Sequence, residues 1–244
     1  MKKIICYNIT NYVTANDCAN IQLCLHASPV MSSEKREVDD FLRFADAVLI
    51  NIGTVSKRDF QTMKVVMKHT RGIPIIFDPV GVGASRFRKK VVRSILNSNK
   101  VGIIKGNYKE LRCIWEQFIL KHPDSNPDTH DLVRIIANRY RCIVVMTGKE
   151  DLVSDGATIM KISGGSPLMP SITGTGCMLG AILTALGGYF PDHLLEVAIL
   201  SSLIWKIVAE KSETKQQGLM HQNLFDQLAT LKIGKDWRDY CEVL

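Results

Sequence analysis

The sequence predicts an α/β fold with a central, mainly parallel sheet that is flanked by helices on both sides. Short apolar runs alternate with stretches of helical periodicity, which is the pattern of a parallel sheet covered by helices. The runs are apolar at consecutive positions, as strands are when both of their faces are buried. The chain has 244 residues, of which 46% are hydrophobic, so a single domain over residues 1–244 can bury a sizeable core.

The predicted elements follow one another in a regular order. Strands are expected at residues 47–52, 73–77, 101–104 and 142–146, and the helices between them at 58–70, 87–96, 108–120 and 131–139. Asp155-Gly156 is a strong turn signal and predicts a hairpin over residues 154–162, between the apolar segments 152–153 and 158–162. Residues 176–190 and 194–210 are apolar around much of their circumference and predict buried helices. Residues 223–231 predict a short amphipathic helix.

Charge and cysteine usage exclude several classes of protein. The formal net charge is +7, with one denser basic group over residues 86–93. Because Phe87 is the one aromatic residue there and no nucleic-acid motif accompanies it, we expect an exposed helix face and no nucleic-acid partner. The seven cysteines form no Cys-x-x-Cys pair and predict reduced thiols in the cytoplasm. The longest nearly apolar run, residues 178–190, is too short to cross a membrane, and we expect no signal peptide.

The ends of the predicted strands indicate where a ligand binds. In an open parallel sheet, ligands bind beyond the carboxyl ends of the strands. Four of these ends carry glycine beside polar or charged residues, in segments 53–54, 78–83, 105–110 and 147–151. Glycine is common in such loops of any α/β protein, so one loop alone is a weak signal. Four in succession favour a ligand site.

The most specific signal is the glycine turn Thr173-Gly174-Thr175-Gly176-Cys177, directly before the buried helical stretch over residues 178–190. Two glycines at the start of a helix expose backbone N–H groups, and the helix dipole adds positive potential. This combination predicts an anion site suited to a transferring phosphoryl group. The turn is neither a Walker P-loop nor a dinucleotide fingerprint. Cys177 lies where a helix end favours a thiolate and could act as general base, or it could be a small buried apolar residue.

Glu110 and Asp78 are candidates for a metal environment. Glu110 follows Asn107 by three residues at the start of a predicted helix, and this spacing has two readings. A carboxylate and a carboxamide on one helix face could hold a hydrated Mg²⁺, or the two residues could form a capping box. Asp78 ends a buried strand before Pro79 and is a second candidate for the metal, or a turn former.

Seven short motifs follow one another with the order and spacing of one enzyme family. They are Ile9-Thr10-Asn11-Tyr12-Val13, Ala27-Ser28-Pro29-Val30-Met31, Asn51-Ile52-Gly53-Thr54, Asp78-Pro79-Val80-Gly81-Val82-Gly83-Ala84, Lys105-Gly106-Asn107, Thr147-Gly148 and Thr173-Gly174-Thr175-Gly176-Cys177. From about residue 8 to about residue 190 the sequence thereby resembles the hydroxyethylthiazole kinase family. The cysteine that closes the glycine turn is informative, since the wider ribokinase-like superfamily usually has aspartate there.

The resemblance implies a ribokinase-like three-layer fold and a reaction. ATP would phosphorylate the hydroxyl of 4-methyl-5-(2-hydroxyethyl)thiazole, with Mg²⁺ as cofactor, in a salvage step toward thiamine. The family commonly forms trimers with active sites between subunits, so a homotrimer is expected here. By position, the resemblance assigns the thiazole alcohol to Met31 and Gly174 with Asn11 and Val13 nearby, ATP to Lys105 and Thr147, Mg²⁺ to Glu110, and the role of base to Cys177.

Two other functions remain possible at this stage. One is an ATP-dependent repair dehydratase on the same fold, against which the Asn11 and Met31 motifs argue. The other is a non-catalytic binding protein that keeps the fold. The intact turn over residues 174–177 favours an enzyme over this last alternative.

Overall fold

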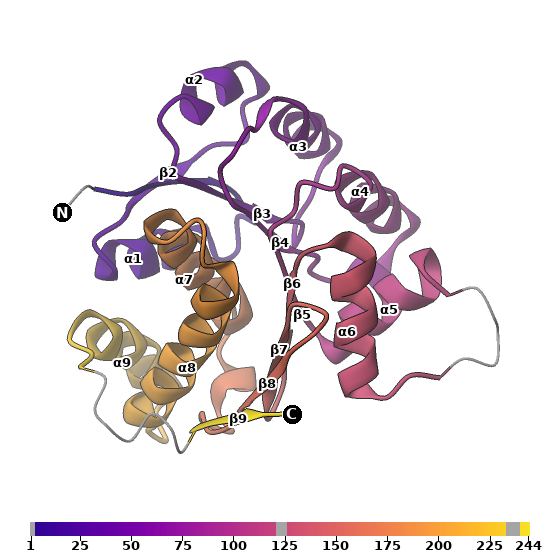
Figure 1. Ribbon diagram of the computed structural model, residues 1–244. Helices are drawn as coiled ribbons and strands as arrows, with labels where there is room; N and C mark the ends of the chain where they lie inside the picture. Colours follow the sequence, from indigo (N-terminus) through magenta and orange to yellow (C-terminus); the bar gives the residue numbers. More distant parts are fainter. Residues whose placement is uncertain (1–2, 121–125, 233–239) are drawn as a thin grey trace.

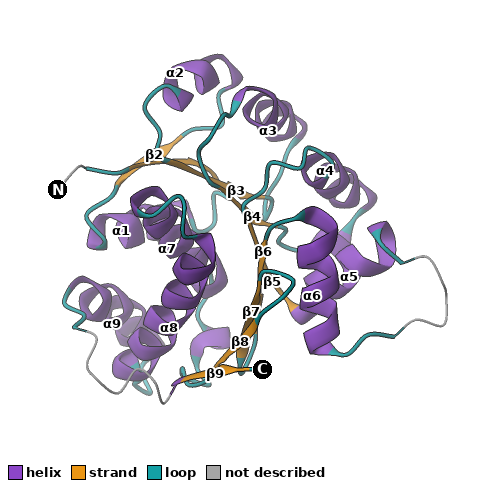
Figure 2. Ribbon diagram, viewed as in Figure 1, coloured by secondary structure: helices purple, strands orange, loops and turns teal. Residues whose placement is uncertain are grey.

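The computed structural model describes residues 3–120, 126–232 and 240–244. The described chain forms three layers, with a sheet between two layers of helices (Figure 2). Helices α1 (Ala15–Cys24), α7 (Thr175–Tyr189), α8 (Leu194–Ser212) and α9 (Gln217–Ala229) lie on one face (Figure 1). The other face carries α3 (Lys57–His69), α4 (Arg86–Leu96), α5 (Tyr108–Phe118) and α6 (Thr129–Tyr140), and the short α2 (Val38–Leu42) packs beside α3. The predicted three-layer α/β fold is confirmed.

The described residues form one sheet, in the order β2-β1-β3-β4-β5-β6-β7-β8-β9. The pairs among β1 to β6 are parallel, whereas β6 to β9 pair antiparallel. The strands are β1 (Ile5–Ile9), β2 (Ser28–Met31), β3 (Ala47–Asn51), β4 (Ile75–Asp78), β5 (Ile103–Asn107), β6 (Ile143–Thr147), β7 (Asp151–Ser154), β8 (Ile159–Ile162) and β9 (Cys241–Val243). The predicted strands and hairpin correspond to β3 to β8.

Alternate residues of the central strands enter opposite cores. Val48 and Ile50 of β3 pack with the helices α3 to α6, whereas Leu49 between them packs with α7 and α8. This is the period of two that a strand imposes on its side chains. Because both faces are apolar, β3 reads as a continuous hydrophobic run, which is why the sequence predicts it correctly.

The sequence prediction differs from the structure at both ends of the chain. It contains no strand for β1, β2 or β9, and it starts the last helix at residue 223, whereas α9 begins at Gln217. Within residues 217–222, Met220 alone is buried, so this segment carries little of the apolar periodicity on which the prediction depends.

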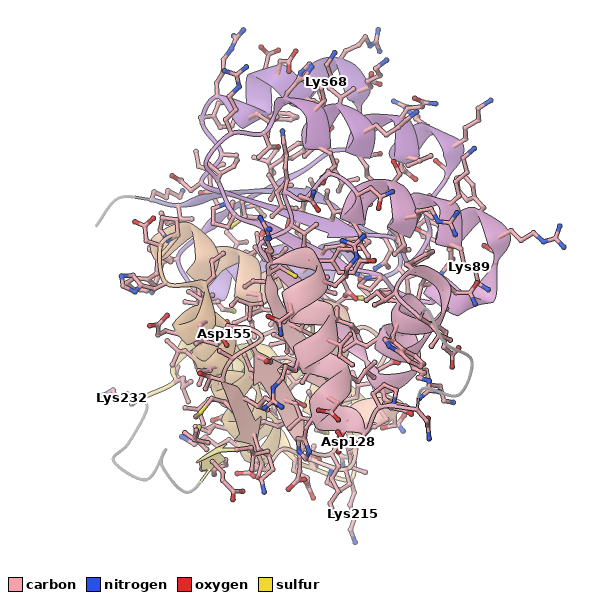
Figure 3. The ribbon with its side chains drawn as sticks, turned by 45° about the vertical axis from the view of Figure 1, so that its right-hand side comes forward. Lys68, Lys89, Asp128, Asp155, Lys215 and Lys232 are labelled. Atoms are coloured by element: carbon pink, nitrogen blue, oxygen red, sulfur yellow. The ribbon has the colours of Figure 1, made fainter. Side chains whose placement is uncertain are left out.

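Charged side chains lie on several sides of the molecule. Lys68, Lys89 and Lys215 extend outward from separate parts of the chain (Figure 3). Among the described residues, no helix is both long and apolar enough to span a membrane. All seven cysteines lie within the described part and are free thiols, as predicted.

The strand order reverses at β1, which lies between β2 and β3. The carboxyl ends of β1 and of β3 to β6 lie at the same end of the sheet, because these strands are parallel. In an open α/β sheet such a switch point is where ligands bind. The glycine turn before α7 reaches this end as well, since Asn11 after β1 contacts Cys177.

Candidate active site

The glycine turn forms the start of α7. Gly174 is the N-cap residue, with φ of 89°, and offers no side chain to accept a hydrogen bond from the first turn. A Cβ at this position would lie 2.5 Å from Thr14 Cγ2, so both the backbone conformation and the close approach to α1 require glycine. The first-turn N–H groups of α7 have no partner within the helix, and Gly176 is exposed. The turn therefore offers donors to an anion.

The sulfur of Cys177 is half-buried between two carboxamides. Asn11 Nδ2 donates to Sγ at 3.4 Å, and Asn51 Nδ2 donates at 3.3 Å. Asn11 follows β1, and Asn51 is the last residue of β3. The side chain of Cys177 is thus held in a polar setting at the switch point of the sheet. Cys177 also packs against the core beneath α7 and α8, so it combines a partly apolar contact with these two polar neighbours.

A buried ion pair lies beside the sulfur. Lys105 Nζ is 3.0 Å from Asp78 Oδ2 and donates to Gly176 O at 3.1 Å, so it also contacts the glycine turn. Asn51 Nδ2 donates to the same Asp78 oxygen at 2.9 Å. These contacts join β3, β4, β5 and α7 into one network.

Burial acts on the two charges of this pair in opposite directions. It raises the pKa of Asp78 above its ordinary value, against the lowering by the ammonium of Lys105. Burial would lower the pKa of Lys105, but the negative charges of Asp78, Cys177 and Glu110 raise it. Both pKa values therefore lie above their ordinary values, that of Asp78 because burial outweighs Lys105 and that of Lys105 because its acidic neighbours outweigh burial. The cluster therefore keeps Lys105 charged and has room for further positive charge.

Glu110 caps α5 and reaches the next loop. The predicted capping box is confirmed, since Glu110 N donates to Asn107 Oδ1 at 3.0 Å while Asn107 N donates to Glu110 Oε2 at 2.9 Å. The other carboxylate oxygen accepts from Gly81 N at 2.8 Å. Glu110 thereby fixes the loop that follows Asp78, and both carboxylates belong to one end of the sheet.

Arg88 ties two loops of the site together, which the sequence did not indicate. Its guanidinium donates to Val80 O at 2.7 Å and to Gly53 O. Arg88 belongs to the basic group of α4, for which the sequence predicted an exposed helix face. Its contacts lie 8 and 35 residues away in sequence, so a pattern along the chain does not show them.

Thr147 ends β6 beside Asn107, with which it pairs in register. Two hydrogen bonds to Gly148 fix the turn after Thr147. Asp151 Oδ1 accepts from Gly148 N at 3.0 Å, and Lys206 Nζ donates to Gly148 O at 2.8 Å. Thr147 itself is half-buried. It borders the site without a contact to Cys177 among the described hydrogen bonds.

Met31 and Val13 lie farther out. Met31 ends β2 at the edge of the sheet, and Val13 lies in the turn before α1. Their exposed fractions are 36% and 57%. The structure therefore brings together Cys177, Gly174, Asn11, Lys105, Asp78 and Glu110, and leaves Thr147, Met31 and Val13 around them.

Two surface hollows lie at the other end of the sheet and carry no comparable chemistry. The larger, of about 610 Å³, is lined by Leu23, Leu25, Tyr189, Phe190 and their neighbours. Tyr189 is the last residue of α7, so it is separated from the glycine turn by the length of a 15-residue helix, about 22 Å. The polar groups that could transfer a phosphoryl group are at the first turn of α7.

The fold and the glycine turn define the class as a ribokinase-like α/β protein. A ribokinase-like superfamily protein from Enterococcus faecalis superimposes with a TM-score of 0.65 at 16% identity, over 92% of this chain and 86% of that one. A pyridoxal kinase from Staphylococcus aureus superimposes with the same TM-score at 13% identity, over 88% and 91% of the two chains. At these identities the similarity shows the fold.

Closer relatives identify the family. The model of the "HK: Hydroxyethylthiazole kinase family" matches residues 2–234. A hydroxyethylthiazole kinase from Listeria monocytogenes serotype 4a is 40% identical over 241 residues, covering 94% of this chain and 88% of the relative. The structure of a hydroxyethylthiazole kinase protein from Pyrococcus horikoshii superimposes with a TM-score of 0.86 at 33% identity, over 99% and 93% of the chains. This chain belongs to the hydroxyethylthiazole kinase family.

Proposed function

We propose that this protein transfers the γ-phosphoryl group of ATP to the hydroxyl of 4-methyl-5-(2-hydroxyethyl)thiazole. The observation that carries the proposal is the position of the Cys177 sulfur, half-buried at the N-terminus of α7 between polar side chains. A base at this place faces the same point as the first-turn N–H groups of the helix. Proton acceptor and anion site are therefore adjacent, as phosphorylation of an alcohol requires.

The proposed step assigns a role to each group around the turn. Cys177 Sγ takes the proton of the substrate hydroxyl, and the alcohol oxygen forms a bond to the γ-phosphorus while the bond to the β–γ bridging oxygen breaks. ADP leaves with that oxygen. The backbone from Gly174 onward stabilises the charge on the transferring group, and the thiazole alcohol lies against Gly174 and Asn11, with Met31 and Val13 covering its apolar ring.

Lys105 and Thr147 are proposed to bind ATP. Lys105 Nζ uses two of its hydrogens on Asp78 Oδ2 and Gly176 O, and an ammonium has three. The third can donate to a phosphate oxygen beside the glycine turn. Thr147 ends the neighbouring strand β6, from which its hydroxyl can reach the nucleotide.

Asp78 and Glu110 fit a magnesium ion that binds together with the phosphates. Asp78 Oδ1 is buried and has no hydrogen-bond partner among the described residues, and each oxygen of Glu110 accepts a single backbone N–H. Mg²⁺ in proteins is usually held by one or two carboxylates plus substrate phosphates. When bound, the ion would neutralise charge on the phosphates of ATP.

We also propose that the protein is a cytoplasmic homotrimer with its active sites between subunits. Three large hydrophobic residues around the site are exposed: Tyr12 by 81%, Val13 by 57% and Met31 by 36%. A neighbouring copy would cover them. Light scattering should give three times the chain mass of 27.3 kDa, and a monomer mass would contradict the trimer.

The enzyme activity is tested with purified protein, Mg²⁺-ATP and the thiazole alcohol. We expect release of ADP together with the phosphorylated thiazole, and a decrease of kcat by about 10²-fold or more in Cys177→Ala, as for loss of a general base. Cys241→Ala, in the distant strand β9, is the matched control and should keep full activity. Folded protein that releases no ADP above background would favour a non-catalytic binding protein. An unchanged kcat in Cys177→Ala would remove the base assignment.

A further inference from the structure

We infer that Arg88 is a positioning residue, which aligns two halves of the candidate site with each other. The alcohol half is the loop after β3 together with Asn11, and the phosphate half is the loop after β4 together with Glu110. The alignment is argued from the contacts of the Arg88 guanidinium. Its catalytic consequence rests on the proposed function, in which the alcohol lies in one half and the phosphates and Mg²⁺ in the other.

The backbone pairing of β3 with β4 ends where the site begins. Asn51 and Asp78 are the last paired residues of the two strands, and Ile52 N donates to Asp78 O at 3.2 Å. Gly53 N donates to the side chain of Asn51 instead, at 2.8 Å. Among the described residues, no backbone hydrogen bond joins the two loops beyond this point. The loops therefore need another connection to keep a fixed separation.

Arg88 supplies that connection. Its Nη1 donates to Val80 O at 2.7 Å, and its Nη2 donates to Gly53 O. Because one carbonyl binds each nitrogen of a single planar group, the guanidinium sets the distance between the two loops. Gly81 permits this approach, since its φ is +63° and a Cβ there would lie 2.5 Å from Arg88 Nη1.

The peptide group between Val80 and Gly81 is bound on both of its polar atoms. Its oxygen accepts from Arg88, and its N–H donates to Glu110 Oε1 at 2.8 Å. The other oxygen of Glu110 accepts from Asn107 N at 2.9 Å. Arg88 therefore acts through one peptide group on the position of a carboxylate that is proposed to bind Mg²⁺.

The Gly53 contact of Arg88 acts on the alcohol half. Gly53 N and Asn11 Nδ2 both donate to Asn51 Oδ1, at 2.8 and 3.0 Å. The next residue, Thr54, accepts from Tyr12 N at 3.2 Å through its hydroxyl. The loop that Arg88 holds at Gly53 O is thus the loop against which the residues after β1 are placed.

The position of Arg88 is itself fixed by α4. Its N–H donates to Ser85 Oγ, at the N-cap of the helix, at 3.2 Å. Arg58 and Arg112 pair with carboxylates, whereas among the described residues the Arg88 guanidinium donates to backbone carbonyls alone. A charged donor binds an oxygen more strongly than a neutral one does. The charge of Arg88 is therefore used to hold the backbone.

The kinetic test compares Arg88→Met with Arg86→Met, which loses the same charge at an exposed position in the first turn of α4. In Arg88→Met each half keeps its own contacts, so KM for ATP and for the thiazole alcohol should stay within about threefold. The kcat should fall by about 10- to 100-fold, because the reacting groups are no longer aligned. Arg86→Met should keep kcat and both KM values.

Arg88→Lys separates alignment from charge. Lysine keeps the positive charge, but it lacks the fork that binds both carbonyls at once. Its kcat should therefore stay closer to that of Arg88→Met than to that of the wild type. Because the charge is kept, Arg88→Lys also provides the test if Arg88→Met does not fold. A wild-type kcat in Arg88→Lys would overturn the inference.

Hydrogen exchange gives a readout that needs neither substrate nor metal. The exchange of backbone amides in the ligand-free protein is followed by mass spectrometry of the peptides that contain Gly53 and Gly81. Exchange in both peptides should be about tenfold faster or more in Arg88→Met and Arg88→Lys, because loops that are held less firmly open more often. Arg86→Met should exchange like the wild type.

The outcomes separate this inference from the proposed function. An unchanged kcat in folded Arg88→Met, a raised KM with kcat kept, or unchanged exchange in both peptides would overturn the inference even if the protein is an active kinase. If no phosphorylated thiazole is formed, the proposed function fails. Faster exchange in both peptides, with wild-type exchange in Arg86→Met, would then still support the alignment by Arg88.

Discussion

The described residues include two buried lysine–aspartate pairs. They differ in how many of their hydrogen-bond donors and acceptors have no partner in the protein. Lys105 is 3.0 Å from Asp78, and Lys206 is 3.0 Å from Asp151. All four residues are less than 10% exposed. Burial raises the pKa of both aspartates, against the lowering by their lysines. By distance and burial alone, the two pairs are alike.

The pair of Lys206 and Asp151 is closed, in the sense that the protein supplies an acceptor for every hydrogen of the lysine. Lys206 Nζ donates to Gly148 O and Lys149 O and faces Asp151 Oδ1, so its three hydrogens all have protein acceptors. Asp151 Oδ1 also accepts from Gly148 N. Every contact serves to hold the turn after β6 in place. A pair with this arrangement stabilises structure and has no donor to offer a ligand.

The pair of Lys105 and Asp78 at the glycine turn is open, in the sense that some of its polar atoms have no partner among the described residues. Lys105 has two protein acceptors for three hydrogens, and Asp78 Oδ1 is buried with no partner among the described residues. An unsatisfied buried oxygen costs about 1–3 kcal/mol, and natural proteins keep such groups where function requires them. The unused atoms, and not the ion pair itself, distinguish the pair in the candidate active site from the structural pair.

Lys206→Met should have the largest effect on stability. It leaves Asp151 buried without a counter-charge, which costs about 3–5 kcal/mol of the free energy of unfolding. For a chain of this size, that corresponds to a decrease of Tm by roughly 6–20 °C, measured by thermal unfolding followed by circular dichroism.

The double variant Lys206→Met/Asp151→Asn is the control. It removes the uncompensated charge while Asn keeps an oxygen for Gly148 N, so it should recover most of the lost Tm. If Lys206→Met unfolds at the wild-type temperature, the pair is not the closed structural element described above.

The fold was largely predictable from the sequence because β3 to β6 are buried on both faces and read as apolar runs. The edge elements were not. In β1, the buried Asn8 exchanges hydrogen bonds with Gln22 of α1, so a polar residue interrupts the run at a position that lies in the core. β9 pairs with β8 across about 80 residues and has three residues, too few for any periodicity.

The site was predictable where a residue stands at a strand end or a helix start. Cys177, Lys105 and Asp78 meet that condition, and the structure gathers them. Asn51 meets it too, as the one polar residue closing the apolar run of β3, but its importance comes from Asn11 and Asp78, which lie 40 and 27 residues away. Lys206 lies in a predicted buried helix, where its pairing with Asp151 depends on tertiary contacts alone.

Asp78→Asn should separate the open pair from the closed one. The amide keeps an oxygen for Lys105 and Asn51 and removes an unsatisfied carboxylate oxygen, which offsets part of the cost of leaving Lys105 buried without a counter-charge. We therefore expect a loss of about 1–3 kcal/mol of the free energy of unfolding, less than for Lys206→Met. Activity should fall by about 10²-fold, equivalent to about 2.7 kcal/mol, because the carboxylate that fits Mg²⁺ and orients Lys105 is lost. Steady-state kinetics and urea unfolding measure the two quantities.

Asp151→Asn is the matched substitution and should keep kcat within a few-fold. If Asp78→Asn instead lost as much stability as Lys206→Met and kept its kcat, the pair at the glycine turn would be structural like the other, and the unsatisfied oxygen would not mark the site of phosphoryl transfer.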